Sequence, residues 1–94
     1  MKAKVLGFKR SKGQFTNQDN GLVIEYDNVQ FFVSKKMLDP GTFGDEVFTV
    51  VLPFKALGFP YDDCVDLVDQ ICSFEVESLD RQRRIYKASE VSVV

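Results

Sequence analysis

Basic side chains alternate with aromatic rings along two segments near the start of the chain. The first segment carries three cations and a ring, and the second carries two rings: Lys9, Arg10, Lys12 and Phe15, then Tyr26 and Phe32. Lysine and arginine can follow the charged backbone of a nucleic acid, and unpaired bases can stack on aromatic rings without any sequence code. The pattern therefore predicts contact with single-stranded nucleic acid.

A second group of such residues lies near the other end of the chain. Its members are Arg81, Arg83, Arg84, Tyr86 and Lys87. The net charge of −2 conceals this distribution, because residues 1–36 carry +4, residues 37–80 carry −9 and residues 81–94 carry +3. A fold that joins the two basic ends would form one groove. The alternative is that these cations only keep strand edges and hairpin tips soluble.

Residue types that support catalysis or metal binding are scarce. Histidine is absent, no serine or cysteine adjoins a plausible base, and no glycine-rich phosphate loop is present, so we expect no enzyme, cofactor or small-molecule substrate. Asp62, Asp66 and Asp69 are expected on a solvated helix face, with no metal bound. Cys64 and Cys72 fall about 12 Å apart along that helix, beyond the roughly 7 Å limit between disulfide-linked Cα atoms. We therefore expect two reduced thiols.

Hydrophobic periodicity predicts five strands and one helix within a single domain, residues 1–94. The expected strands are 3–15, 22–34, 46–54, 73–79 and 84–94, with a helix over 61–71. Gly7 and Gly13 mark places where the first strand could bulge, and Asn20-Gly21 is a strong hairpin-turn signal. No signal peptide or membrane span is apparent, so a cytoplasmic location is expected.

Alternation along residues 22–34 separates a core face from an aromatic, polar face. Val29, Phe31 and Val33 are expected inside, whereas Tyr26 and Phe32 lie on the opposite face. Apolar surroundings also place further phenylalanines in the core, and these are Phe48, Phe54 and Phe74.

The order of three strands, one helix and two strands favours an all-β fold, a closed five-stranded barrel of the OB type. In OB-folds the ligand crosses the second and third strands, between the loops that join strands one to two and four to five. The basic and aromatic residues fall at those places. An SH3-like barrel with an inserted helix and an open α+β sheet are alternative folds.

Two sequence segments resemble a known family. Residues 4–15, KVLGFKRSKGQF, and residues 24–33, IEYDNVQFFV, look like the small single-stranded-DNA-binding proteins of phages and mobile elements, the gene V type. The resemblance implies an OB-fold dimer that coats DNA during phage or plasmid replication. By position it points to Lys9, Arg10, Lys12, Tyr26 and Phe32. Apart from the resemblance, only the alternation of Val91 and Val93 favours a homodimer.

The leading hypothesis is sequence-tolerant binding of single-stranded DNA. A protein-protein adaptor module and a single-stranded-RNA-binding protein are the alternatives. Nothing in the sequence identifies a reader of the 2′-hydroxyl that distinguishes RNA from DNA.

Overall fold

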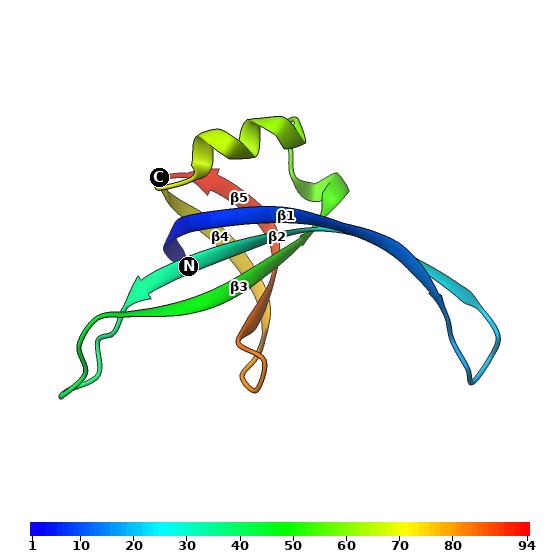
Figure 1. Cartoon of the computed structure of the whole chain (residues 1–94), viewed down its shortest axis with the longest axis horizontal. Helices are drawn as coiled ribbons and strands as arrows, with labels where there is room; N and C mark the ends of the chain where they lie inside the picture. The colour runs from blue at the N-terminus through cyan, green and yellow to red at the C-terminus, as the bar shows by residue number, and fades with distance from the viewer.

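The computed structural model describes all 94 residues as a closed barrel of five strands (Figure 1). The strands are β1 (Lys2–Thr16), β2 (Val23–Lys36), β3 (Asp45–Pro53), β4 (Ile71–Asp80) and β5 (Ile85–Val93). Between β3 and β4 lie a single turn, η1 (Phe54–Ala56), and a short helix, η2 (Tyr61–Leu67). The predicted order of three strands, a helix and two strands is confirmed.

The barrel is a mixed sheet with the strand order β1-β2-β3-β5-β4. β1 pairs with β2, β2 with β3, β4 with β5 and β1 with β4 in antiparallel fashion, while β3 and β5 are parallel. The arrangement is OB-like, as the sequence predicted. It excludes the open α+β sheet, because the pairing of β1 with β4 closes the barrel.

A β-bulge at Leu6 determines which side chains of β1 point outward. The register of β1 against β2 shifts between Val5 and Gly7. Before the bulge, odd-numbered Ala3 and Val5 are buried, and after it, even-numbered Phe8 pairs with fully buried Phe31. The bulge therefore turns Lys9 to the outside. It was expected near Gly7, whereas the bulge expected near Gly13 is absent.

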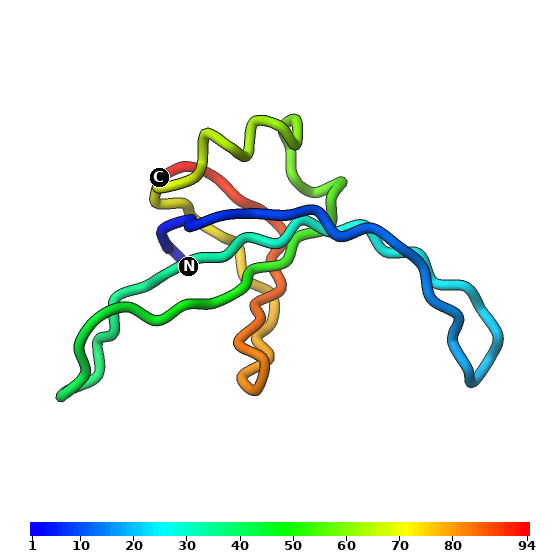
Figure 2. The backbone as a smooth tube through the Cα atoms, viewed as in Figure 1, coloured from blue at the N-terminus to red at the C-terminus, as the bar shows by residue number.

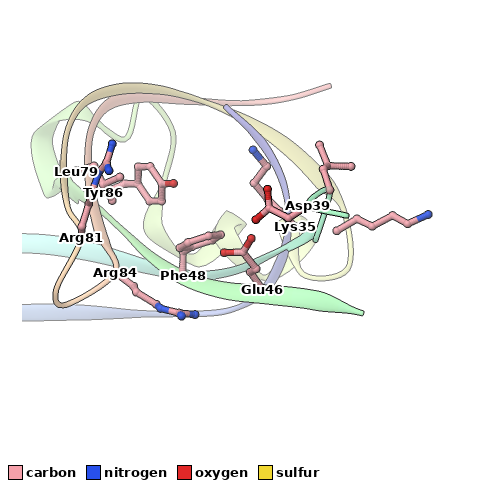
Figure 3. A pocket seen from close by; sticks show the side chains of 10 residues that line it. Lys35, Asp39, Glu46, Phe48, Leu79, Arg81, Arg84 and Tyr86 are labelled. Carbon is pink, nitrogen blue, oxygen red and sulfur yellow. The ribbon is translucent and has the colours of Figure 1, made fainter. Parts of the chain in front are cut away.

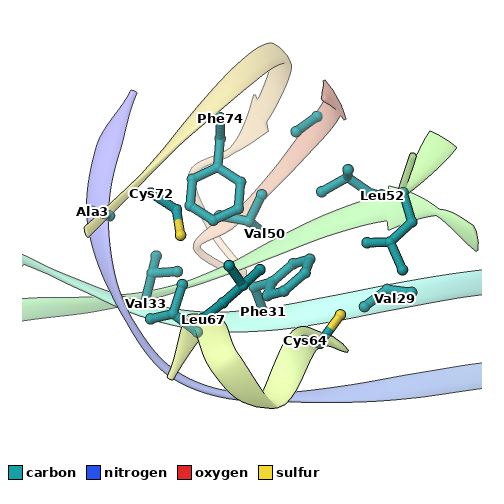
Figure 4. Packing of buried hydrophobic residues seen from close by; sticks show 13 residues of the cluster. Ala3, Val29, Phe31, Val33, Val50, Leu52, Cys64, Leu67, Cys72 and Phe74 are labelled. Carbon is teal, nitrogen blue, oxygen red and sulfur yellow. The ribbon is translucent and has the colours of Figure 1, made fainter. Parts of the chain in front are cut away.

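The core fills the barrel with side chains from every strand and from η2 (Figure 4). Val29, Phe31 and Val33 are completely buried, which confirms the predicted facing of β2. The Phe31 ring packs 5.7 Å from that of Phe74, the other phenylalanine that the core encloses.

Two phenylalanines predicted for the core are only partly covered. Phe48 and Phe54 pack against the core, but each remains half-exposed. Phe48 lies near the start of β3 and Phe54 directly after its end, so both rings sit at the rims of the barrel. Apolar neighbours along the chain did not reveal that position.

The helix is shorter than its sequence pattern indicated. The 3₁₀-helix η2 buries Cys64 and Leu67, which share a face because this helix repeats every three residues. The predicted helix extended to Ile71, but Val68 is already extended and Ile71 begins β4, where it is exposed. The chain leaves the helix to bond with β1, because the Asp69 amide donates to the Val5 carbonyl at 2.8 Å.

Beyond the last pair of β2 with β3, Asn28 with Pro53, strands β1 and β2 continue as a long curved hairpin, which we call the wing (residues 11–28; Figure 2). Its loop is wider than the expected tight Asn-Gly turn, since the Asn17 amide donates to the Leu22 carbonyl at 2.7 Å. Only Gly21 of the two turn residues adopts a positive φ, of 70°. The predicted hairpin is confirmed with a longer connection.

Cys64 and Cys72 are free thiols without any solvent exposure. Burial raises the pKa of both thiols above the ordinary range, and the thiolate is the reactive form. We therefore expect almost no alkylation by iodoacetamide at pH 8 in the folded protein and two alkylated cysteines after urea denaturation. Mass spectrometry gives both values, and rapid native labelling of either residue would contradict the packing.

Neither helical segment has the length and apolar composition that crossing a membrane requires. No cluster of three acidic or cysteine side chains has the geometry of a metal site. Asp62, Asp66 and Asp69 are all exposed.

Candidate nucleic-acid interface

The outer surface of four neighbouring strands presents aligned rows of side chains. In the central row, Lys9 pairs with Gln30, Gln30 with Val51, and Val51 with Lys87. The adjacent rows contain Gly7, Phe32, Thr49 and Ile85 on one side and Ser11, Asn28 and Pro53 on the other. We call these three rows the outer face. It contains two lysines and no acidic residue.

A cation at the β1 end of the central row lies beside an aromatic ring of the adjacent row. Lys9 Nζ is 5.9 Å from the centroid of the Phe32 ring, which is half-buried. A cation at this distance is attracted to the ring face and stays close to it. The pair thus places a positive charge beside a flat apolar surface.

Two further rings extend the outer face onto the wing. Phe15 and Tyr26 are exposed to 53% and 39%, and their ring centroids are 6.4 Å apart. Gly13 pairs with Tyr26 and leaves room for its ring, because a Cβ atom at Gly13 would lie 2.5 Å from the Tyr26 hydroxyl. The predicted residues Lys9, Phe15, Tyr26 and Phe32 therefore share one surface.

Arg10 lies at the base of the wing, on the face opposite that of Lys9. Its guanidinium donates two hydrogen bonds to the Asp27 carboxylate, at 2.8 and 2.7 Å, and stacks 3.7 Å from the centroid of the Phe54 ring. The hydrogen bond from Arg10 holds the pKa of Asp27 below its usual value, and the charge of Lys12 lowers this pKa further. Arg10 is thus neutralised and held in place.

Lys12 shares the face of Arg10, because it pairs directly with Asp27 across the wing. The sequence grouped Lys9, Arg10 and Lys12 as one basic cluster, but alternation along β1 separates Lys9 from the other two. Ser11, between Arg10 and Lys12, points to the outer face with Lys9.

Residues of the β4–β5 hairpin line a pocket at one end of the barrel, separate from the outer face (Figure 3). Phe48 and Tyr86 meet there edge to face, with centroids 5.2 Å apart. The pocket has a volume of about 390 Å³ and lies between the start of β3, the end of β2 and the β4–β5 hairpin. Its lining also contains four cations and two acids, namely Lys35, Lys36, Arg81, Arg84, Asp39 and Glu46. We call this the mouth pocket.

The cations of the mouth pocket have no ion-pair partner. The structure contains two ion pairs, Arg10 with Asp27 and Arg83 with Asp80. The second is long, at 4.0 Å, and leaves Arg83 exposed at the hairpin tip. The two acids of the pocket therefore leave an excess positive charge in its lining.

Arg84 holds a backbone conformation that arginine rarely adopts. Its φ is 54°, in the left-handed region, at a cost of about 1–2 kcal/mol for a residue with a side chain. The Arg84 carbonyl accepts a hydrogen bond from the Thr49 amide at 3.1 Å, which fixes the turn against β3. Glycine would fit the same turn without strain. Strained positions of this kind cluster at functional sites.

The two basic ends of the chain thus converge in two ways. Lys87 joins Lys9 on the outer face, whereas Arg81, Arg84 and Tyr86 meet Lys35 and Lys36 in the mouth pocket. Phe48, Lys35 and Lys36 were absent from the predicted site. The available signal was the Lys35-Lys36 pair at a strand end, directly before the Asp39-Pro40-Gly41 loop.

Five acidic residues of the middle segment lie on η2 and β4, namely Asp62, Asp63, Asp66, Glu75 and Glu77. Two others, Asp39 and Glu46, line the mouth pocket. The Val91 side chain packs against the core, so it does not form an exposed pair with Val93.

Fold and surface together define an OB-like barrel with a basic, aromatic outer face. Comparison of the chain with protein-family models, curated proteins and solved structures finds no match. The resemblance to the phage single-stranded-DNA-binding proteins is therefore supported by the barrel topology alone.

Proposed function

We propose that the protein binds single-stranded DNA across its outer face with little sequence preference. The observation that carries this proposal is the acid-free set of rows in which Lys9 lies over the Phe32 ring and Lys87 completes the row. The Phe32 ring offers a stacking surface to a base of any type, and the two lysines can contact backbone phosphates.

The wing lengthens this surface. Phe15 and Tyr26 continue the line of exposed rings beyond the barrel, on the same side as Phe32. Arg10 is committed to Asp27 and Phe54, so we assign it the role of holding the wing at its angle to the barrel. Lys12, on the same side as Arg10, is expected to contribute less than Lys9.

A titration of fluorescently labelled oligo-dT at two salt concentrations tests the proposal. With about four neutralised phosphates, the slope of log K against log salt is near −3, from about −0.7 per contact. Affinity is then expected to fall about 60-fold between 50 and 200 mM salt. No binding at micromolar protein in low salt would contradict the proposal.

Gly13 provides a test of the Tyr26 ring. Gly13→Ala places a methyl group against the Tyr26 ring, so the ring must move. We expect both Gly13→Ala and Tyr26→Ala to weaken oligo-dT binding. The loss is about 1–3 kcal/mol, the contribution of one stacked base.

Gly7→Ala is the matched control, since a Cβ atom at Gly7 meets nothing within 4 Å. Because both changes act through one ring, Gly13→Ala should add little to Tyr26→Ala in the double variant. Full additivity would show that Gly13 acts by another route.

An adaptor function has one specific observation in its favour. Leu38 and Phe43, in the loop between β2 and β3, are exposed to 85% and 92%, as expected of residues that contact another protein. That function predicts indifference to oligonucleotides.

Two further measurements test the remaining expectations. Competition between matched DNA and RNA oligomers separates DNA binding from RNA binding, the third alternative. Light scattering tests the expected homodimer.

A further inference from the structure

The mouth pocket brings together the two features used to bind nucleotides, aromatic rings and cations. Its aromatic pair, Phe48 and Tyr86, is half-buried, with Arg81 and Arg84 near it and Lys35 on the other side of the pocket, beyond Glu46 (Figure 3). The cavity of about 390 Å³ lies within the range typical of small-molecule sites. It can hold a group the size of one nucleotide.

Charge identifies the ligand further. Four cations against two carboxylates leave an excess of +2 in the lining. None of the four belongs to either ion pair of the structure. A phosphate monoester carries about −1.5 to −2 at neutral pH, which complements this excess.

Arg84 adds an independent observation. The turn keeps an arginine at a φ of 54°, where glycine would be less strained, and this arginine lines the pocket. Because the turn itself does not need an arginine, the strain at this position points to a role for the side chain.

We infer that the mouth pocket is a nucleotide site, in which one unpaired base lies against the aromatic pair and its phosphate lies among the four cations. The inference deepens the proposed function, on which it rests for the nature of the ligand. The nucleotide can come from a phosphorylated strand end, from the interior of a strand or from free mononucleotide.

The first experiment uses thymidine 5′-monophosphate with amide NMR shifts as the readout. The nucleotide is expected to shift the amides of Phe48 and Tyr86, and thymidine without phosphate should bind at least about tenfold more weakly, as expected from the loss of one charge-assisted hydrogen bond. Shifts confined to the outer face, or none at millimolar nucleotide, would overturn the inference.

Arg84→Gly is the informative variant. Loss of the side chain should weaken nucleotide binding at least about tenfold, while the thermal midpoint stays the same or rises because glycine relieves the strained φ. Arg81→Gln should weaken binding without altering the turn. Lys55→Gln, on the exposed turn η1 and outside both surfaces, is the control and should leave mononucleotide binding unchanged. Normal nucleotide binding by both pocket variants would refute the assignment.

Oligonucleotides separate the sources and the two proposals. If a strand end binds, 5′-phosphorylated dT8 should bind more tightly than unphosphorylated dT8, and Arg84→Gly should abolish the difference. If an interior nucleotide binds, Arg84→Gly should weaken both oligomers equally. Mononucleotide binding without oligo-dT binding would refute the proposed function and leave the pocket inference standing. Oligo-dT binding together with normal mononucleotide binding by both pocket variants would refute the pocket inference and leave the proposed function standing.

Discussion

Phe31→Ala is expected to destabilise the protein by about 3–5 kcal/mol, the loss typical of a large aromatic side chain removed from a core. The Phe31 ring has no solvent exposure and packs against Phe74. Its removal therefore leaves a cavity inside the barrel, closed off from solvent. Urea denaturation followed by circular dichroism measures the change in the free energy of unfolding.

The adjacent residue gives the matched comparison. Phe32 points to the outer face, where its ring lies 5.9 Å from Lys9 Nζ and is half-buried. Phe32→Ala should cost about 1 kcal/mol of stability at most, the value of a cross-strand contact. It should weaken oligo-dT binding by about 1–3 kcal/mol. Equal losses of stability in the two variants would refute the facing of β2.

Neutralising both lysines of the central row should change how binding responds to salt. Lys9 and Lys87 lie at opposite ends of the row that crosses β1, β2, β3 and β5. The Lys9→Gln/Lys87→Gln double variant loses two of about four phosphate contacts, so the slope of log K against log salt should change from about −3 to about −1.4. Fluorescence titrations at four or more salt concentrations give the slope.

Lys12→Gln is the control for this measurement. Lys12 has the same charge and strand as Lys9 but shares its face with Asp27. Its slope should remain near the wild-type value. A decrease as large as that of the double variant would mean that DNA wraps the other side of the wing.

Much of the fold followed from the sequence because strand periodicity is a local property. The alternation of Val29, Phe31 and Val33 predicted the buried face of β2, and the order of elements predicted the closed barrel. The predicted end of the helix was wrong, because Val68 and Ile71 continue the helical spacing of apolar residues although the helix stops at Leu67. The backbone of β1 competes for that segment, and no local pattern shows this competition.

The surface was harder to predict, because it depends on pairings between distant strands. Lys9 and Arg10 are adjacent in sequence, but the bulge at Leu6 and the alternation beyond it send them to opposite sides. Lys87 shares a row with Lys9, and Tyr86 contacts Phe48, only because β5 lies beside β3. Their chemistry was visible in the sequence, whereas their grouping was not.

The parallel pairing of β3 with β5 also determines when a growing chain acquires its surface. β5 is the last strand to be synthesised, yet it takes a central place between β3 and β4. Closure by such long-range pairs is slow compared with hairpin formation. A nascent chain that has not yet released β5 can form the wing, with its exposed rings, but lacks both the complete central row and the mouth pocket. The proposed DNA binding would therefore require β5 to be paired in its place in the barrel.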